Sequence, residues 1–266
     1  MRSGSKTSSA RSRAGHVPRK RFGQHFLHDR GVLARIVDAI APAREDVIVE
    51  IGPGEGALTR ALLERVPHVV AIEIDRDLAA RLAGEFPPER LTIHCADALE
   101  FDFAVLPEGA RIVGNLPYNI STPLLFRLAE QAARLRDLHF MLQREVVERM
   151  VAQHSTSDYG RLSVMLQVRF RMKKLFTVAP GAFRPPPKVE SAVVRMEPIP
   201  EDELPKMDIK VFADLVRRAF SARRKTLRNA LGLQAEDFEV LRLDPKLRPE
   251  NLSPSDYVRI ARRLER

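Results

Sequence analysis

Cysteine is almost absent from this chain of 266 residues, which contains only Cys95. A single thiol excludes an intramolecular disulfide and a zinc site made of clustered cysteines, and we expect no bound metal. Cys95 ends an apolar run over 91–95, so we expect a small, buried side chain there. Long apolar runs are absent too: no stretch approaches the roughly 18 residues of a membrane span, and we expect no membrane partner.

The N-terminal segment, 1–20, has no apolar core of the kind that secretory signals need, and it is rich in serine and basic residues. We interpret it as a disordered basic tail and expect a cytoplasmic protein. Acidic residues are also outnumbered, 35 against 44 lysines and arginines, which gives a net charge of +9. The surplus favours a polyanionic partner such as nucleic acid or a ribosome. The alternative is a solvated surface with surplus arginine.

Short β-rich runs alternate with helical stretches between residues 46 and 146, which predicts a parallel sheet with helices on both faces. The expected strands are 47–51, 68–74, 91–95, 111–114 and 138–142. The expected helices are 57–65, 77–85 and 122–134, the last capped by Ser121 or Thr122. Two further strands, expected at 162–170 and 190–197, would extend the sheet with antiparallel pairing.

Prolines and acidic residues gather in the segment 198–205, which indicates a linker between domains. Helical periodicity follows at 209–220, 222–231 and 254–264. We therefore expect a large α/β domain over 21–200 and a small, all-helical domain over 206–266.

The tetrapeptide Asn115-Leu116-Pro117-Tyr118 directly follows the apolar run 111–114. The Asn115 carboxamide oxygen and the backbone carbonyl of Leu116 or Pro117 can accept both hydrogens of an exocyclic amino group. Pro117 fixes the turn, and Tyr118 offers a face on which a base can stack. The pattern indicates chemistry on an aromatic amine such as N6 of adenine. The alternative is an ordinary turn after a strand.

A glycine-rich segment, Glu50-Ile51-Gly52-Pro53-Gly54-Glu55-Gly56, links the first strand to the first helix. Glycines allow a tight turn and a close approach of the backbone to a ligand, so Gly52 and Gly54 are predicted to bind a cofactor. The spacing differs from the G-x-G-x-x-G of dinucleotide binders, and the acidic neighbours disfavour a pyrophosphate. S-adenosylmethionine fits better, since it carries a sulfonium and an ammonium group.

Two more acids follow the next two expected strands. Glu73 lies 21 residues after Gly52, where a carboxylate can accept both hydroxyls of a ribose, and Asp97 can approach the adenine amino group. Either acid alone is more often a cap or a loop residue. Signals at three consecutive strand ends favour one cofactor site, because ligands of open α/β sheets bind at those ends.

Many ordered segments of the chain together closely resemble the KsgA/RsmA family of small-subunit ribosomal RNA adenine dimethyltransferases. The resemblance runs from Lys20 to about Leu264. The matching segments are RFGQHFL (21–27), EIGPGEG (50–56), EID (73–75), NLPYNIS (115–121), FMLQ (140–143), YGRLS (159–163), FRPPPKV (183–189) and AFSARRK (219–225).

This resemblance implies a Rossmann-like, S-adenosylmethionine-dependent methyltransferase domain followed by a small helical domain. It implies dimethylation of N6 of two adjacent adenosines in the hairpin loop near the 3′ end of 16S rRNA, in late assembly of the small subunit. The implied partner is 16S rRNA within the 30S subunit or its precursor, and we expect a monomer.

The cofactor residues of the family, carried over onto this chain, are His25, Leu27, Gly52, Glu73, Asp97 and Asn115. The family usually has asparagine where this chain has His25, so the backbone there is expected to contribute more than the side chain. His25 as a catalytic base is a less favoured alternative.

The catalytic residues that we predict are Asn115, Leu116, Pro117, Tyr118 and Phe183. Acceptors on both N–H bonds would direct the N6 lone pair at the methyl group, so positioning suffices without a dedicated base. Stacking on Tyr118 would hold the extruded base, and Phe183 would supply the opposite face. The alternative for Phe183 is core packing.

Basic residues are dense between 217 and 228, where no acid occurs. Phosphate neutralisation by such a cluster gives strong, salt-dependent binding, although a solvated helix face is the alternative. The predicted RNA-binding residues are Arg217, Arg218, Arg223, Arg224, Lys225 and Arg228. A second basic group comprises Arg169, Arg171, Lys173 and Lys174.

Three rival functions remain. A large-subunit rRNA adenine dimethyltransferase of the antibiotic-resistance type shares the N-L-P-Y core. A small-subunit assembly checkpoint, with methylation incidental, uses the same partner. A dehydrogenase is opposed by the glycine spacing.

Overall fold

The computed structural model describes residues 24–265, so the tail predicted at 1–20 lies outside the described residues. The strands are β1 (Phe26–Leu27), β2 (Ile48–Ile51), β3 (Val69–Glu73), β4 (Leu91–Cys95), β5 (Ala110–Asn115), β6 (Leu135–Gln143), β7 (Phe170–Val178), β8 (Phe183–Arg184) and β9 (Ser191–Pro198). The helices are α1 (Arg30–Ile40), α2 (Ala57–Leu63), α3 (Arg76–Glu85), α4 (Ser121–Glu130), α5 (Arg144–Val151), α6 (Arg161–Gln167), α7 (Ile209–Ser221), α8 (Leu227–Leu231), α9 (Ala235–Leu241) and α10 (Pro254–Leu264).

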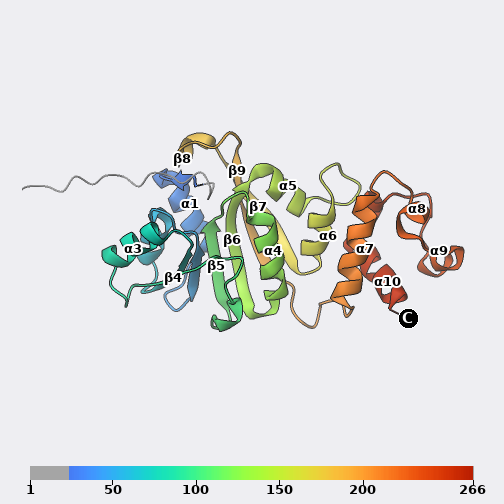
Figure 1. The fold of residues 1–266 in the computed structure, drawn as a ribbon, viewed down its shortest axis with the longest axis horizontal. Helices are drawn as coiled ribbons and strands as arrows, with labels where there is room; N and C mark the ends of the chain where they lie inside the picture. The colour runs from blue at the N-terminus through green and yellow to red at the C-terminus, as the bar shows by residue number, and fades with distance from the viewer. Residues whose placement is uncertain (1–23, 266) are drawn as a thin grey trace, which may run out of the picture.

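Seven strands form one mixed sheet in the order β4-β3-β2-β5-β6-β9-β7 (Figure 1). The pairs from β4 to β6 are all parallel, and β9 runs antiparallel to both β6 and β7. The parallel sheet is therefore confirmed, and so is its antiparallel extension by the strand predicted at 190–197. A separate two-stranded pair joins β1 to β8.

Helices cover the sheet on both faces. On one face, Ile36 of α1, Leu62 of α2 and Leu82 of α3 pack in one buried core. On the other face, Leu125 of α4 and Val147 of α5 belong to a second core. This three-layer arrangement follows from strands that are apolar on both sides. No described helix is long and apolar enough to cross a membrane.

The strand predicted at 162–170 is wrong: residues 161–167 form helix α6, and β7 begins only at Phe170. Leu162 and Leu166 face the core beneath α4 and α5, while Val164 and Val168 face the core of the C-terminal helices. Along the sequence these four apolar residues alternate with others, as they would in a strand. In the structure they belong to two stripes of one helical segment, and each stripe faces a different core.

Cys95 was predicted to be buried, but it is exposed, because β4 is an edge strand. The cap predicted for α4 is also wrong. The N-cap is Ile120, and the Ser121 hydroxyl instead donates to the Pro117 carbonyl at 3.0 Å. The helix predicted at 222–231 is shorter, since α8 begins at Leu227 after a turn.

The C-terminal helices α7 to α10 lie at one end of the molecule (Figure 1). Phe212 and Leu215 of α7 pack with Tyr257 and Ile260 of α10 in a third core. Tyr159, which precedes α6, belongs to the same core, so the helical part packs directly on the sheet domain.

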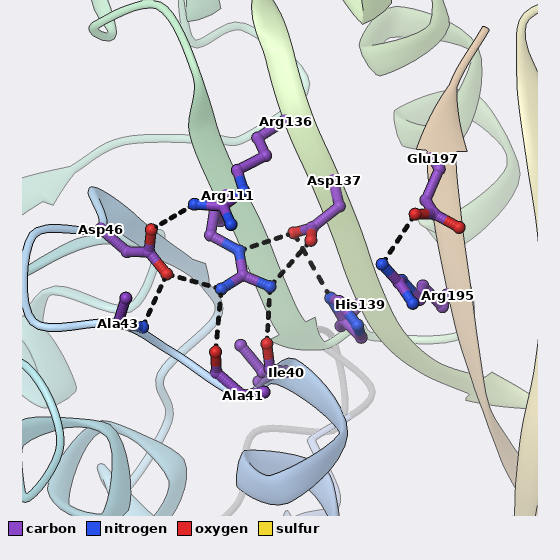
Figure 2. A network of polar contacts seen from close by, with 10 residues as sticks. All are labelled: Ile40, Ala41, Ala43, Asp46, Arg111, Arg136, Asp137, His139, Arg195 and Glu197. Carbon is purple, nitrogen blue, oxygen red and sulfur yellow. Dashed lines mark hydrogen bonds and ion pairs between the residues drawn. The ribbon is translucent and has the colours of Figure 1, made fainter.

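A buried arginine joins four segments at the start of β5 (Figure 2). Arg111 is 4% exposed, and its Nη1 donates to Asp46 Oδ2 at 2.6 Å. Its Nε and Nη2 donate to the two carboxylate oxygens of Asp137 on β6 at 2.9 and 2.7 Å. Nη2 also donates to the Ile40 carbonyl at the end of α1, at 2.6 Å. One guanidinium thus ties α1, the segment before β2, β5 and β6 together.

The pKa of Asp137 is set by its contacts in this network. Burial raises its pKa, but His139 and Arg111 outweigh burial and lower the pKa to about 2. His139 Nδ1 lies 3.6 Å from the carboxylate, beyond ordinary hydrogen-bond distance, so we ascribe the lowering mainly to Arg111. The ordinary value is 3.8, so this stabilisation is present above that pH and is lost as the pH falls through about 2.

We expect Arg111→Leu to lower the free energy of unfolding by about 3–5 kcal/mol, because it leaves the buried carboxylate of Asp137 without its arginine and removes one of the two cations that pair with Asp46. Urea denaturation near neutral pH measures the loss. Arg136→Ala is the matched control: Arg136 is exposed and pairs with the other oxygen of Asp46, so we expect a loss of about 1 kcal/mol or less. Equal losses in the two variants would contradict the account.

Candidate active site

A cavity of about 320 Å³ opens at the carboxyl ends of the parallel strands. Residues 24–27 and the segments that follow β2 to β5 supply much of its wall. Parallel neighbours bring their carboxyl ends to one edge, which is why signals distant in the sequence meet here. The lining includes the predicted residues His25, Leu27, Gly52, Gly54, Glu73, Asp97, Asn115, Leu116, Pro117 and Tyr118.

The glycine-rich turn adopts the backbone that its sequence predicts. Gly52 and Gly54 have φ values of 69° and 57°, in the left-handed region that favours glycine. A Cβ on Gly54 would lie 2.9 Å from Cδ1 of Phe26, so a side chain there would displace β1 from the turn. The turn therefore keeps its backbone accessible while β1 packs against it.

Glu73 is held rigidly at the end of β3. The N–H of Gly54 donates to Oε2 at 3.0 Å, and the N–H of Asp75 donates to Oε1 at 2.9 Å. Burial raises the pKa of this carboxyl although both N–H groups oppose the rise. Each carboxylate oxygen has a second lone pair, so the group can also accept ribose hydroxyls.

Glu50, at the end of β2, is a second buried carboxyl in the cavity wall. The Thr59 hydroxyl donates to its Oε2 at 2.6 Å. Burial raises the pKa of Glu50 to about 7, and the nearby charge of Glu73 adds to the rise. Two buried carboxyls facing one cavity favour a cationic ligand over a pyrophosphate.

Asp97 lies in the cavity wall after β4, and its Oδ1 accepts the N–H of Leu99 at 2.8 Å. Asp97 therefore stabilises its own loop, which is the role of an ordinary loop residue, and it also lines the cavity.

The orientation of the Asn115 carboxamide is fixed by the N-terminal segment. Its Nδ2 donates to the backbone carbonyl of His25 at 2.9 Å. A carbonyl only accepts, so the amide nitrogen must point toward His25, and Oδ1 is the group that can serve a ligand. The backbone carbonyl of His25 thus orients the Asn115 carboxamide.

Tyr118 is half-buried beside this amide. Its hydroxyl is 2.8 Å from the Ser191 hydroxyl, and its ring stacks on the His25 ring with centroids 5.7 Å apart. His25 Nδ1 lies 2.8 Å from the Pro185 carbonyl, so Nδ1 carries the proton. The His25 ring therefore positions the Tyr118 ring.

Phe183 does not face the cavity in this structure. It is 2% exposed, lies in β8 opposite Leu27, and belongs to the core between the sheet and α1. Its predicted contact with the base is thus not observed, and core packing, the alternative, is. The ring is buried because its own short strand, β8, pairs with β1.

Several cavity residues carry no sequence signal. Ile36, His139, Met141 and Val193 line the side nearest α1. From the sequence alone, each would be taken for an ordinary core residue. Only the register of β5, β6 and β9 brings them beside Asn115.

The predicted basic surface is only partly free of ion pairs. Arg217 pairs with Asp214, and Arg223 pairs with Glu250. Among residues 24–265, no ion pair is formed by Arg218, Arg224, Lys225 or Arg228. In the second group, Arg171 pairs with Glu203 and Lys174 with Glu148.

A neighbouring loop adds positive charge that the sequence did not indicate. The N–H groups of Leu227 and Arg228 donate to the carbonyls of Leu247 and Pro245, at 2.7 and 3.3 Å. These bonds place the loop 242–248 beside α8. Its exposed basic residues are Arg242, Lys246 and Arg248.

The family described as ribosomal RNA adenine dimethylase matches residues 15–266. The chain belongs to this family. Ribosomal RNA small subunit methyltransferase A of Thiobacillus denitrificans is 61% identical over 244 residues, which cover 91% of this chain and 96% of that protein. The protein of the same name from Nitrosospira multiformis is 58% identical, over 94% of this chain and 98% of the relative.

Solved structures of related enzymes share the whole fold of this ribosomal RNA adenine dimethylase. A dimethyladenosine transferase from Plasmodium falciparum has a TM-score of 0.77 at 25% identity, over 91% of this chain and 98% of that one. The 23S rRNA methyltransferase ErmE has a TM-score of 0.68 at 26% identity, over 91% and 100%. The Rossmann-like methyltransferase fold predicted from the resemblance is confirmed, and the chain is an rRNA adenine dimethyltransferase.

The cavity fits the methyl donor that such enzymes generally use. S-adenosylmethionine has a sulfonium, an ammonium and a ribose, which suit two buried carboxyls and an open glycine turn. The residues that would hold it are those carried over above: the backbone near His25 and Leu27, the glycine turn, Glu73, Asp97 and Asn115.

Glu50→Gln removes one buried carboxyl and keeps an acceptor for the Thr59 hydroxyl. The folded pKa of Glu50 is about 7 against an ordinary 4.5, so stability falls as the pH rises between these values. Above pH 7 the carboxylate costs about 3 kcal/mol. We expect the variant to be more stable than the wild type at a pH of about 8, and its stability to decline less steeply between pH 4.5 and 7, because only the buried carboxyl of Glu73 remains.

Denaturation across this pH range makes the comparison. Glu55→Gln, in the same turn but partly exposed and paired with Arg81, should change stability by less than about 0.5 kcal/mol. A decline in Glu50→Gln as steep as in the wild type would refute the assignment.

Proposed function

We propose that the chain dimethylates N6 of two adjacent adenosines in the 3′-terminal hairpin loop of 16S rRNA, using S-adenosylmethionine. It acts on the 30S subunit or its precursor in late assembly, as a cytoplasmic monomer. The observation that carries the proposal is the oriented Asn115 carboxamide, held by His25 beside the glycine turn.

The comparisons favour the small subunit as the substrate. Relatives named as small subunit methyltransferases are 55–61% identical over nearly the whole chain, whereas the 23S enzyme ErmE is 26% identical. The large-subunit reading therefore has less support. The assembly-checkpoint role is compatible with the same binding surface.

Hydrogen bonds within the turn after β5 indicate which backbone carbonyl is free to be the second acceptor for the amino group. The Pro117 carbonyl already accepts the Ser121 hydroxyl at 3.0 Å and the N–H of Ile120 at 3.2 Å. Both of its lone pairs are engaged, so we assign the second acceptor to the Leu116 carbonyl. Asn115 Oδ1 would accept one N6–H and Leu116 the other.

This arrangement acts on the lone pair of N6, which is delocalised into the adenine ring. Acceptors on both N–H bonds favour a pyramidal nitrogen whose lone pair points at the methyl group. The bound donor supplies an already activated methyl. The protein then contributes positioning and aligned dipoles, and the N6 proton leaves to solvent.

We expect Asn115→Ala to lower methyl transfer to unmethylated small subunits by about 10²- to 10³-fold, because an oriented acceptor is lost at the reacting atom. Transfer of labelled methyl groups measures the loss, and binding to the subunits should be retained. Asn119→Ala, on the exposed rim, should lose less than about threefold. Full activity in Asn115→Ala would sink the mechanism.

RNA binding should depend on the unpaired basic residues of α8 and of the turn between α7 and α8. Replacing Arg224, Lys225 and Arg228 together by alanine should weaken binding and reduce the slope of log K against log salt by about 2 to 3. Arg217→Ala is the control, because its charge is already paired with Asp214. A triple variant with an unchanged salt slope would exclude this surface.

A further inference from the structure

A row of side chains crosses the sheet beside the Asn115 carboxamide. Asn115 of β5 lies opposite Met141 of β6, and Met141 lies opposite Val193 of β9. Residues directly opposite each other point to the same face, with Cβ atoms roughly 5 Å apart. All three line the cavity, on the face that α1 covers with Ile36.

The part of the cavity beyond Asn115 is apolar. Met141 and Val193 are 2% and 1% exposed, and Ile36 closes the space from the helix side. We name the space between these three side chains the Met141–Val193 recess. The nearest polar side chains on this face of β6 are His139 and Gln143, each two residues from Met141 and therefore about 6.7 Å along the strand.

A second methyl transfer poses a steric and polar problem. After the first transfer, N6 carries one hydrogen and one methyl group, and a methyl group cannot donate to a carbonyl oxygen. A methyl directed at an enclosed polar surface would leave acceptors there unpaired. The base can react again only if an apolar space receives that methyl.

We propose that the Met141–Val193 recess receives the first N6-methyl group during the second transfer, which makes Val193 and Met141 determinants of dimethylation. The proposal rests on the proposed function. The remaining N6–H donates to the Leu116 carbonyl while the methyl group lies in the Met141–Val193 recess. Flexible, polarisable Met141 adapts to either substituent.

Each of the two transfers has the same balance. The S–CH3 bond of the donor breaks and its electron pair stays on sulfur, which leaves a neutral thioether. The N6 lone pair forms the new N–CH3 bond, and one N6 proton passes to water. Only the space beside the nitrogen differs between the first and second transfers.

Val193→Leu fills the recess from β9. We expect the ratio of N6-methyladenosine to N6,N6-dimethyladenosine in small-subunit RNA to rise at least tenfold over the wild type, at equal total transfer. Mass spectrometry of the digested nucleosides over a time course measures the ratio. A variant that merely disturbed the fold would slow both transfers and leave this ratio unchanged.

Val194→Leu is the matched control. Val194 is the next residue of β9, equally buried, and points to the opposite face of the sheet. Its ratio should stay within about twofold of the wild type. The thermal shift caused by S-adenosylhomocysteine should be the same in both variants, which shows that the cofactor site is intact without relying on activity.

A ratio in Val193→Leu equal to that in Val194→Leu would overturn the proposal. If Val193→Leu loses all transfer, Val193→Ile, which adds the same methylene but keeps the β-branched shape of valine, is judged by the same criterion. Failure of the proposed function looks different: the wild type would then form no N6,N6-dimethyladenosine in small subunits.

Discussion

The hydrogen bond from Asn115 Nδ2 to the His25 carbonyl is the contact on which the site depends. It decides which atom of the carboxamide is free to face the cavity, and it holds the N-terminal segment over the end of β5. Because β1 pairs with β8, the same contact brings the Pro-rich segment to this wall, where the Pro185 carbonyl meets His25. Segments at residues 25, 115 and 185 thus form one enclosure.

Strand β5 has two polar ends and an apolar middle. Arg111 fixes its start by joining Asp46, Asp137 and the end of α1, while Asn115 at its other end lines the cavity. Anchoring at the start places β5 against β2 and β6, so the glycine turn after β2 and the tetrapeptide after β5 meet across one strand spacing. In the proposed function this register brings the methyl donor and the acceptor base together, and no local motif specifies it.

Local signals predicted what lies at strand ends, and tertiary packing decided the rest. The glycine turn, Glu73, Asp97 and Asn115 were predicted because the edge of a parallel sheet gathers them. Helix α6 was taken for a strand since it is buried on two sides, and Phe183 was placed at the base because the β1–β8 pairing has no sequence signature. The ion pairs of Arg217 and Arg223, and the cavity wall at Met141 and Val193, likewise depend on partners distant in the sequence.

The central claim is that this site adds two methyl groups to adenine N6 of the small subunit. Labelled S-adenosylmethionine offered in parallel to unmethylated small subunits, large subunits and bare RNA tests it directly, with the labelled nucleoside identified in each. The account predicts N6,N6-dimethyladenosine at two adjacent positions of 16S rRNA in the small subunit. Label in the large subunit, or at an atom other than N6, would contradict it.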